Sequence, residues 1–251
     1  MTARLEIRSL HKRFGALAVT DGISLDIAPG ELHAIIGPNG AGKTTLVAQL
    51  SGQLAPDSGQ VLYDGRDITH MDMAGRVHLG MARSFQITTI LHGFTVLQNV
   101  ALAVQARKGS SFRFFGRADA EPALNAAAIG YLRQVGLAER AGDVARNLSH
   151  GEHRQMEFAI ALATAPRLLL LDEPFAGTGR QEAEQLLALM RQIKGKQTTL
   201  LVEHDMNAVF ALADRISVLV YGRIIATGTP GEIRANAEVR AAYLGEEDAA
   251  C

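Results

Sequence analysis

A glycine-rich segment near the N-terminus constrains the fold of this 251-residue chain more than any other feature. The segment reads Gly37-Pro38-Asn39-Gly40-Ala41-Gly42-Lys43-Thr44-Thr45 and matches the pattern G-x-x-x-x-G-K-[ST]. The apolar run Leu32 to Ile36 before it predicts a buried strand, and residues 43–52 after it have helical character. A glycine loop between a strand and a helix is typical of a phosphate-binding loop in an α/β domain.

The chemistry of this loop predicts that it binds a nucleotide through its β and γ phosphates, with Mg²⁺ as the metal. Glycines allow successive backbone N–H groups to point at phosphate oxygens, and the N-terminus of the following helix adds its positive dipole. We expect Lys43 to neutralise the β and γ phosphates and the Thr44 hydroxyl to bind Mg²⁺. The alternative, a glycine turn followed by a surface lysine, is disfavoured because so specific a pattern rarely arises by chance.

Two carboxylates, Asp172 and Glu173, directly follow the apolar run Leu168 to Leu171, which predicts a second buried strand. In a protein with a phosphate-binding loop, carboxylates at this place supply a metal ligand and a group near the attacking water. We therefore predict that Asp172 binds the metal and that Glu173 is the catalytic base. Taken alone, Asp-Glu after a strand is more typical of a helix cap or a solvated turn. The upstream loop favours the catalytic interpretation.

The rest of the chain predicts a parallel sheet interrupted by helices. Alternating apolar and polar residues at 5–10 and 23–27 indicate a β-rich opening, and helical spacing extends from about residue 95 to residue 148. After Ser149, helices and strands alternate, as expected for a parallel sheet flanked by helices. The expected helices span 152–165, 181–193 and 206–213, and the expected strands span 167–172, 198–203 and 216–221.

Composition excludes several classes of function. The chain has 25 basic and 26 acidic residues, so its overall charge does not favour nucleic acid or an anionic membrane surface. The basic and aromatic stretch 107–117 favours a solvated connection between helices over a contact with lipid headgroups. Cys251 is the only cysteine, which excludes an internal disulfide and a cysteine-rich metal site. The N-terminus lacks the apolar core of a signal peptide, and no apolar run approaches the about 20 residues of a membrane-spanning helix. We expect a cytoplasmic protein that binds no nucleic acid.

A third motif makes the interpretation specific. Leu148-Ser149-His150-Gly151-Glu152 ends twenty residues before Asp172 and resembles the signature motif of ABC ATPases. The resemblance implies that Ser149, Gly151 and Glu152 help to bind ATP, with the N-terminus of a helix facing a γ-phosphate held on an opposite subunit. Ser149 and Glu152 also fit an ordinary helix N-cap with a capping box, and the two interpretations are compatible.

The resemblance assigns three further positions that occur in the order of the family. It implies that Gln86 reaches Mg²⁺ and the lytic water and links the site to a membrane subunit. It implies that His204 contacts the γ-phosphate and that the Phe14 ring stacks on adenine. Each of these residues, taken alone, is more typical of a structural role. The expected catalytic residues are Lys43, Gln86, Glu173 and His204, and the expected metal ligands are Thr44, Gln86 and Asp172.

Four less specific sequence segments resemble those of one branch of the family, the ATPases of branched-chain amino acid importers and their relatives. These segments are Ala82-Arg83-Ser84-Phe85-Gln86, Phe94-Thr95-Val96-Leu97-Gln98-Asn99-Val100, Asn147-Leu148-Ser149 and Tyr243-Leu244-Gly245-Glu246-Glu247. The chain departs from the family at Ala176-Gly177-Thr178-Gly179-Arg180, which lacks the usual Leu, Asn or Asp, and Pro. We expect Thr178 and Gln181 to form a replacement capping box there.

The expected fold is a single ABC nucleotide-binding domain over residues 1–251. It would consist of a P-loop α/β core, a small antiparallel β subdomain and a helical subdomain inserted at about 87–165. The resemblance implies an ATPase that pairs head to tail with a second ATPase chain, either a copy of itself or a paralogue. It also implies integral-membrane permease subunits, a periplasmic or extracellular solute-binding protein and a place on the inner face of the plasma membrane. The implied function is to power the uptake of branched-chain amino acids or a related small polar or amphipathic solute.

Three alternatives fit the sequence less well. The ATPase of a lipopolysaccharide-extraction system has a segment similar to Asp172-Glu173-Pro174-Phe175-Ala176-Gly177 but a different context around the glutamine. A soluble ABC protein that acts on nucleic acid or the ribosome would carry long coiled coils, zinc modules or a second phosphate loop. A small-molecule kinase would not explain the signature motif or His204.

Overall fold

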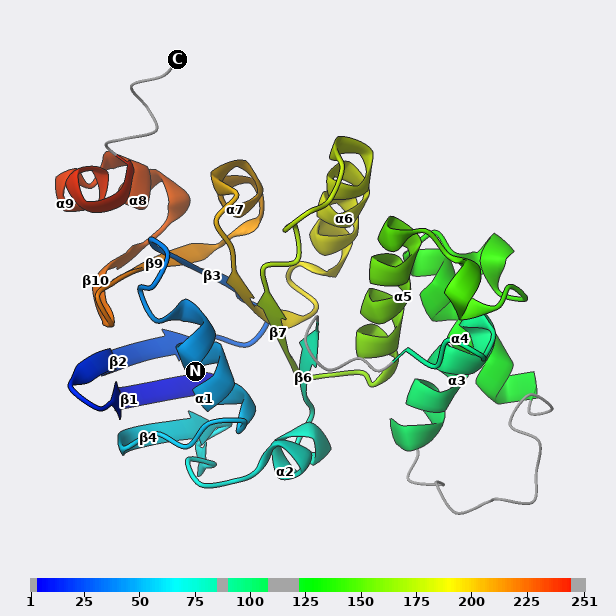
Figure 1. The fold of residues 1–251 in the computed structure, drawn as a ribbon, viewed down its shortest axis with the longest axis horizontal. Helices are drawn as coiled ribbons and strands as arrows, with labels where there is room; N and C mark the ends of the chain where they lie inside the picture. Colours follow the sequence, from blue (N-terminus) through cyan, green and yellow to red (C-terminus); the bar gives the residue numbers. More distant parts are fainter. Residues whose placement is uncertain (1–3, 85–89, 108–121, 245–251) are drawn as a thin grey trace.

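The computed structural model describes residues 4–84, 90–107 and 122–244, and a six-stranded sheet lies at its centre (Figure 1). In spatial order its strands are β10 (Arg223–Gly228), β9 (Arg215–Val220), β3 (Leu32–Ile36), β8 (Thr198–Val202), β7 (Leu168–Asp172) and β6 (Met81–Ser84). The strands from β9 to β6 are parallel, and β10 is antiparallel to β9. The predicted parallel sheet is therefore confirmed.

Strand β3 is apolar at almost every position because it is buried on both faces. Leu32, Ala34 and Ile36 belong to one hydrophobic core, whereas Ile35 belongs to a second core on the opposite side of the sheet. All five residues of β3 are buried, including His33. A strand buried in this way shows a continuous apolar run in place of polar alternation, which is the pattern that the sequence shows.

One face of the central sheet is covered by helix α1 (Lys43–Ser51) and by a second, four-stranded sheet, which share one hydrophobic core. The strands of this sheet are antiparallel where they pair. In spatial order they are β2 (Leu17–Ile27), β1 (Leu5–Phe14), β4 (Ser58–Tyr63) and β5 (Arg66–Asp67). The short helix α2 (Met73–His78) then leads to β6. The expected antiparallel β subdomain is present.

The other helices follow β6 in the sequence. Three of them, α3 (Val96–Arg107), α4 (Pro122–Gln134) and α5 (His150–Ala163), pack together beyond the edge strand β6 (Figure 1). Two 3₁₀ turns, η2 (Ala138–Arg140) and η3 (Ala145–Asn147), connect α4 to α5. The remaining elements are α6 (Arg180–Ile193), α7 (Met206–Leu212), α8 (Pro230–Ala235), α9 (Ala237–Val239) and the π-helical turn η4 (Arg240–Leu244).

Helices are thus inserted between β6 and β7, as expected, whereas the boundary of this subdomain at about 87–165 stays a prediction. Within the described ranges, no helix has both the length and the apolar character needed to cross a bilayer. Gln86, most of the stretch 107–117 and the tail from Gly245 lie outside the described residues.

One local prediction was wrong, because α6 does not use Thr178 as its N-cap. The N-cap is Gly179, whose backbone N–H donates to Glu182 Oε2 at 3.1 Å. The Thr178 hydroxyl donates instead to the carbonyl oxygen of Phe175 at 2.7 Å. Because the helix starts one residue later than the predicted capping box requires, Gln181 is not in the third helical position. The helix predicted at 152–165 also begins earlier, at His150.

Candidate nucleotide-binding site

The order of the strands brings the predicted motifs to one edge of the sheet. The glycine loop follows β3, Asp172 ends β7, and His204 comes two residues after β8. Strand β8 lies between β3 and β7, and all three are parallel. In open parallel sheets, ligands bind at the carboxyl ends of the strands. Residues that are more than 130 positions apart in the sequence therefore meet at one edge.

Glycine is required at two positions of the loop. A Cβ atom at Gly37, where φ is +153°, would lie 2.0 Å from the carbonyl oxygen of Leu219. A Cβ atom at Gly42, where φ is +106°, would lie 2.3 Å from the carbonyl oxygen of Val19. Both neighbours are backbone atoms that cannot rotate away, so these two glycines allow β9 and β2 to approach the loop closely.

A cavity of about 190 Å³ lies at the loop. It is lined by Val19, Asn39, Gly40, Ala41, Gly42, Lys43, Thr44, Thr45 and Glu173. The predicted phosphate-binding residues and the predicted catalytic base thus share one cavity, and only Gly37 and Pro38 of the predicted loop are missing from its lining.

The Lys43 side chain is buried under the loop. Its Nζ donates hydrogen bonds to the carbonyl oxygens of Gly37 at 2.7 Å and Pro38 at 3.0 Å. Burial lowers the pKa of Lys43, and the carboxylates of Glu173, Asp172 and Glu203 act in the opposite direction. The ammonium is therefore held by neutral carbonyls near three carboxylates, and phosphate oxygens are stronger acceptors that can replace those carbonyls.

Asp172 offers one oxygen atom to a metal. Its Oδ2 accepts from the Arg83 guanidinium at 3.0 Å, whereas its Oδ1 is buried and has no hydrogen-bond partner within the described part of the chain. Burial raises the pKa of Asp172, and Arg83 opposes this effect. Thr44 is exposed in the first turn of α1. An unpaired carboxylate oxygen and a hydroxyl are hard oxygen ligands, so this pair fits Mg²⁺ that is also bound by phosphate.

The described residues contain no group of three or more His, Cys, Asp or Glu side chains that could hold a metal ion by themselves.

Glu173 adopts a left-handed backbone conformation, with φ of +52°. Its N–H donates to the carbonyl oxygen of Val202 at 2.8 Å, so the contact between β7 and β8 continues past the end of β7. A non-glycine residue in this region costs about 1–3 kcal/mol, and such residues are concentrated at functional sites. The bend sets the Glu173 side chain on the wall of the loop cavity.

Glu203 is a residue of the site that the sequence patterns did not single out. It is fully buried, and its carboxylate accepts from the backbone N–H groups of Phe175, His204 and Asp205 at 2.8, 2.8 and 3.1 Å. It therefore fixes both the segment after Glu173 and the segment that contains His204. A carboxylate at the end of an apolar strand was the signal that could have identified it. The His204 side chain is 56% exposed, which leaves it accessible to a ligand.

Ser149, Gly151 and Glu152 lie apart from the loop cavity, and none of them lines it. Ser149 caps α5 as predicted: Glu152 N–H donates to Ser149 Oγ at 3.3 Å, and Ser149 N–H donates to Glu152 Oε2 at 2.8 Å. Helix α5 and the loop helix α1 lie on opposite sides of β7 in Figure 1. Phe14, at the end of β1, is 52% exposed, and Lys12 Nζ lies 5.8 Å from its ring centre.

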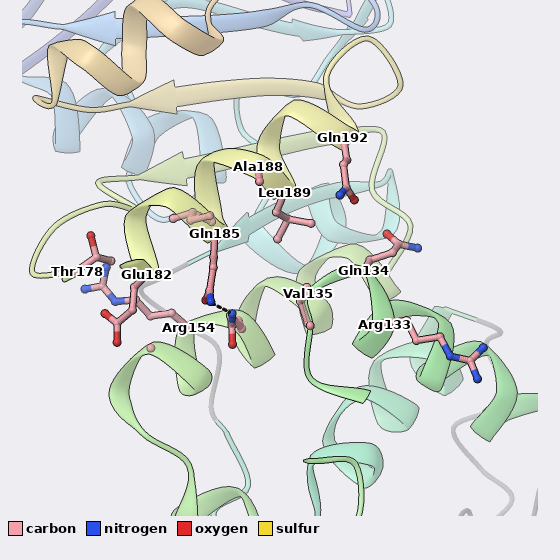
Figure 2. A pocket seen from close by; sticks show the side chains of 14 residues that line it. Arg133, Gln134, Val135, Arg154, Thr178, Glu182, Gln185, Ala188, Leu189 and Gln192 are labelled. Atoms are coloured by element: carbon pink, nitrogen blue, oxygen red, sulfur yellow. Dashed lines mark hydrogen bonds between the residues drawn. The ribbon is translucent and has the colours of Figure 1, made fainter. Parts of the chain in front are cut away.

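A second cavity, of about 310 Å³, lies between α5, α6 and the end of α4 (Figure 2). Gln155 on α5 donates to Gln185 on α6 at 2.8 Å, the dashed line in Figure 2. Arg154 also reaches out of α5 and donates to the carbonyl oxygen of Pro174 at 2.8 Å. A hydrogen bond therefore connects α5, the helix that begins at the signature motif, to Pro174, the residue after Glu173.

Sequence comparisons identify relatives over nearly the whole chain. The family model described as "ABC transporter" matches residues 20–176, and that described as "Branched-chain amino acid ATP-binding cassette transporter" matches residues 223–249. The chain is 37% identical over 254 residues to the "High-affinity branched-chain amino acid transport ATP-binding protein LivG" of Escherichia coli (strain K12). It is 36% identical over 251 residues to the corresponding protein BraF of Pseudomonas aeruginosa. Both matches cover 96% of this chain and 98% of the relative.

Solved structures show the same fold. The ADP conformation of an ATP-binding cassette from an ABC transporter gives a TM-score of 0.83 at 29% identity and covers 98% of this chain and all of that one. A nucleotide-free cassette gives a TM-score of 0.81 at 29% identity, with 96% and 98% covered. The predicted fold class is confirmed by these structures. The chain therefore belongs to the ABC transporter family, in the branch of the branched-chain amino acid transport ATP-binding proteins.

Proposed function

We propose that this chain is the ATP-binding and ATP-hydrolysing subunit of an importer for branched-chain amino acids or a related small solute. The names of its relatives support the solute class, because they refer to branched-chain amino acid transport. The main support for ATP hydrolysis is that Glu173 lines the same cavity as the phosphate loop. Neither lipopolysaccharide extraction nor a soluble, non-transport role is favoured by these relatives.

Each residue at the sheet edge has one task in this proposal. The loop N–H groups and Lys43 hold the phosphates, and Lys43 exchanges its two loop carbonyls for phosphate oxygens. Glu173 accepts a hydrogen bond from the attacking water and orients it. Asp172 Oδ1 and the Thr44 hydroxyl would hold Mg²⁺, which supplies stabilisation of the developing phosphate charge. His204 contacts the γ-phosphate, the Phe14 ring stacks on adenine, and Gln86 completes the metal site.

The separation of the signature motif from the loop supports a head-to-tail pair of ATPase chains. In such a pair, ATP lies between the loop of one chain and residues 149–151 of the other. ATP binding favours the closed pair, and hydrolysis releases it. We further propose that the chain acts on the inner face of the plasma membrane, beneath permease subunits that receive solute from a solute-binding protein.

Replacing Glu173 by Gln tests the pairing, because the amide keeps the size of the side chain and removes the base. We expect the molar mass of purified Glu173→Gln protein, measured by light scattering, to change from monomer to dimer when Mg-ATP is added. The matched control is Glu184→Gln on the exposed face of α6, which should hydrolyse ATP and show no trapped dimer. If ATP binds to Glu173→Gln and the mass stays monomeric, self-pairing is excluded and the partner is a second ATPase chain. If ATP does not bind, the proposed function fails.

Uptake of radiolabelled leucine tests the solute class. Cells that carry Glu173→Gln in place of the native chain should lose leucine uptake, while uptake of an unrelated anion such as sulfate should be unchanged. Unchanged leucine uptake, with the variant protein present at native levels, would exclude the branched-chain assignment.

A further inference from the structure

A buried ion pair connects β6 to the end of β7. Arg83 donates to Asp172 Oδ2 at 3.0 Å, and the two side chains are only 5% and 4% exposed. The same guanidinium donates to Gln53 Oε1 at 2.6 Å and lies 3.4 Å from Ser51 Oγ, at the C-terminal end of α1. Arg83 therefore spans the distance from the end of the loop helix to the carboxylate expected to bind metal.

This contact makes the two oxygens of Asp172 different. Oδ2 is occupied by Arg83, and Oδ1 is buried without a hydrogen-bond partner among the described residues. A buried acceptor without a partner is unfavourable unless another group satisfies it. Because the guanidinium is itself held at the C-terminal end of α1, its contact with Oδ2 restrains the orientation of the carboxylate.

We propose that Arg83 is a positioning residue for the metal site. It holds Asp172 by Oδ2, so that Oδ1 is presented to Mg²⁺ in one orientation. The inference rests on the proposed hydrolysis of Mg-ATP and adds a residue whose role no sequence pattern assigned. Mutation of a group that orients a metal ligand typically weakens metal affinity or activity about 10–100-fold.

The test uses the purified chain and three variants. Arg83→Met removes the guanidinium, Arg83→Lys keeps a charge that can reach Asp172 but cannot also span to α1, and Gln53→Ala removes the 2.6 Å contact on the α1 side. The control is Arg167→Met, which removes an Arg–Asp pair of the same 3.0 Å length whose arginine is 58% exposed. Thermal unfolding midpoints are measured for each protein without ligand, with ATP and EDTA, and with ATP and Mg²⁺.

We expect Mg²⁺ to raise the midpoint of the ATP-bound wild-type protein and of the control by the same amount. In Arg83→Met this increment should fall to less than about half, and the Mg²⁺ concentration for half-maximal ATPase activity should rise about tenfold, the usual effect of losing a group that orients a metal ligand. kcat should fall more than KM for ATP rises. Arg83→Lys and Gln53→Ala should give intermediate increments.

Equal losses of stability in all three conditions, with an unchanged Mg²⁺ increment, would overturn the proposal and leave Arg83 a structural residue. If Arg83→Met does not fold, the test uses the rise in unfolding midpoint that Mg²⁺ causes in Arg83→Lys and Gln53→Ala. A rise equal to that of the wild-type protein in both variants would overturn the proposal. Failure of the proposed function itself looks different, because the wild-type chain would then show neither a Mg²⁺ increment nor hydrolysis.

Discussion

Arg76, on α2, gives a quantitative test of how the phosphate-loop helix is held. Its side chain is 1% exposed, and its guanidinium donates to five backbone carbonyl oxygens. The acceptors belong to Gln49, Leu50, Ile68, Thr69 and Met71. Two of them lie in the last turn of α1, where a positive charge also opposes the negative end of the helix dipole. Arg76 therefore fixes the end of α1 opposite to the phosphate loop.

The effect of Arg76→Met follows from these contacts. Each hydrogen bond from a charged donor is worth about 1.5–3 kcal/mol, so five independent bonds would exceed the whole stability of many domains. The net loss is smaller, because the variant no longer buries a charge and water can reach some of the carbonyls. Burial lowers the pKa of Arg76 to about 10, so the group is still charged at neutral pH. We expect a loss of about 4 kcal/mol in the free energy of unfolding, because each buried carbonyl that stays unpaired costs about 1–3 kcal/mol and water reaches only some of the five.

Urea unfolding and calorimetry measure this loss. For a chain of this size, about 4 kcal/mol corresponds to a decrease in Tm of roughly 8–16 °C. Arg76→Lys should be intermediate, because an ammonium has three donors for five carbonyls. Arg180→Met, at a side chain that is 94% exposed, is the control and should change stability little. A loss below about 1 kcal/mol for Arg76→Met, or a Lys variant equal to wild type, would refute the reasoning.

Three further changes test the geometry of the site. A Cβ at Gly151 would lie 2.2 Å from Glu182 Oε1. Gly151→Ala should therefore raise the free energy of unfolding by about 1 kcal/mol, the gain in helix propensity, only when Glu182 is also replaced by Ala. If urea unfolding shows that the effects of the two substitutions simply add, this expectation is contradicted. The hydrogen bond from the Ser149 backbone is the main cause of the lowered pKa of Glu152, so the stability contributed by this charge is present above about pH 4.5 and is lost as the pH falls through the folded-state value. The stability difference between wild type and Glu152→Gln should therefore shrink on acidification, and a constant difference would count against the assignment. Gly42→Ala should weaken ATP binding about tenfold or more by calorimetry, because its Cβ meets a backbone carbonyl at 2.3 Å. Gly40→Ala, whose Cβ meets nothing within 4 Å, should weaken it less.

Much of the fold could be predicted because the signals are local. Strands β3 and β7 were predicted from apolar runs, since a strand buried on both faces has no polar alternation. The N-cap of α5 was predicted because Ser149 and Glu152 complete their capping box within four residues. Thr178 and Gln181 show the limit of such patterns. The N-cap of α6 is Gly179, one residue after the predicted N-cap, so the predicted capping box does not form.

The sequence by itself also determined which residues gather at the sheet edge. The glycine loop and the Asp172-Glu173 pair each follow a predicted strand, and the carboxyl ends of parallel strands meet at one edge. The catalytic and metal-binding roles of these residues, of His204 and of Gln86 stay predictions, which the experiments above address.

Only the tertiary structure decided how the site is supported. Arg83 reaches Asp172 across 89 positions of sequence, and Arg76 reaches the end of α1 across 26 and 27 positions. Glu203 fixes the backbone at Phe175, and Glu182 lies against Gly151. These contacts depend on the distance and orientation at which whole elements pack. A sequence pattern records which residue types recur at short spacing, and it carries no information about which distant backbone atom a long side chain reaches.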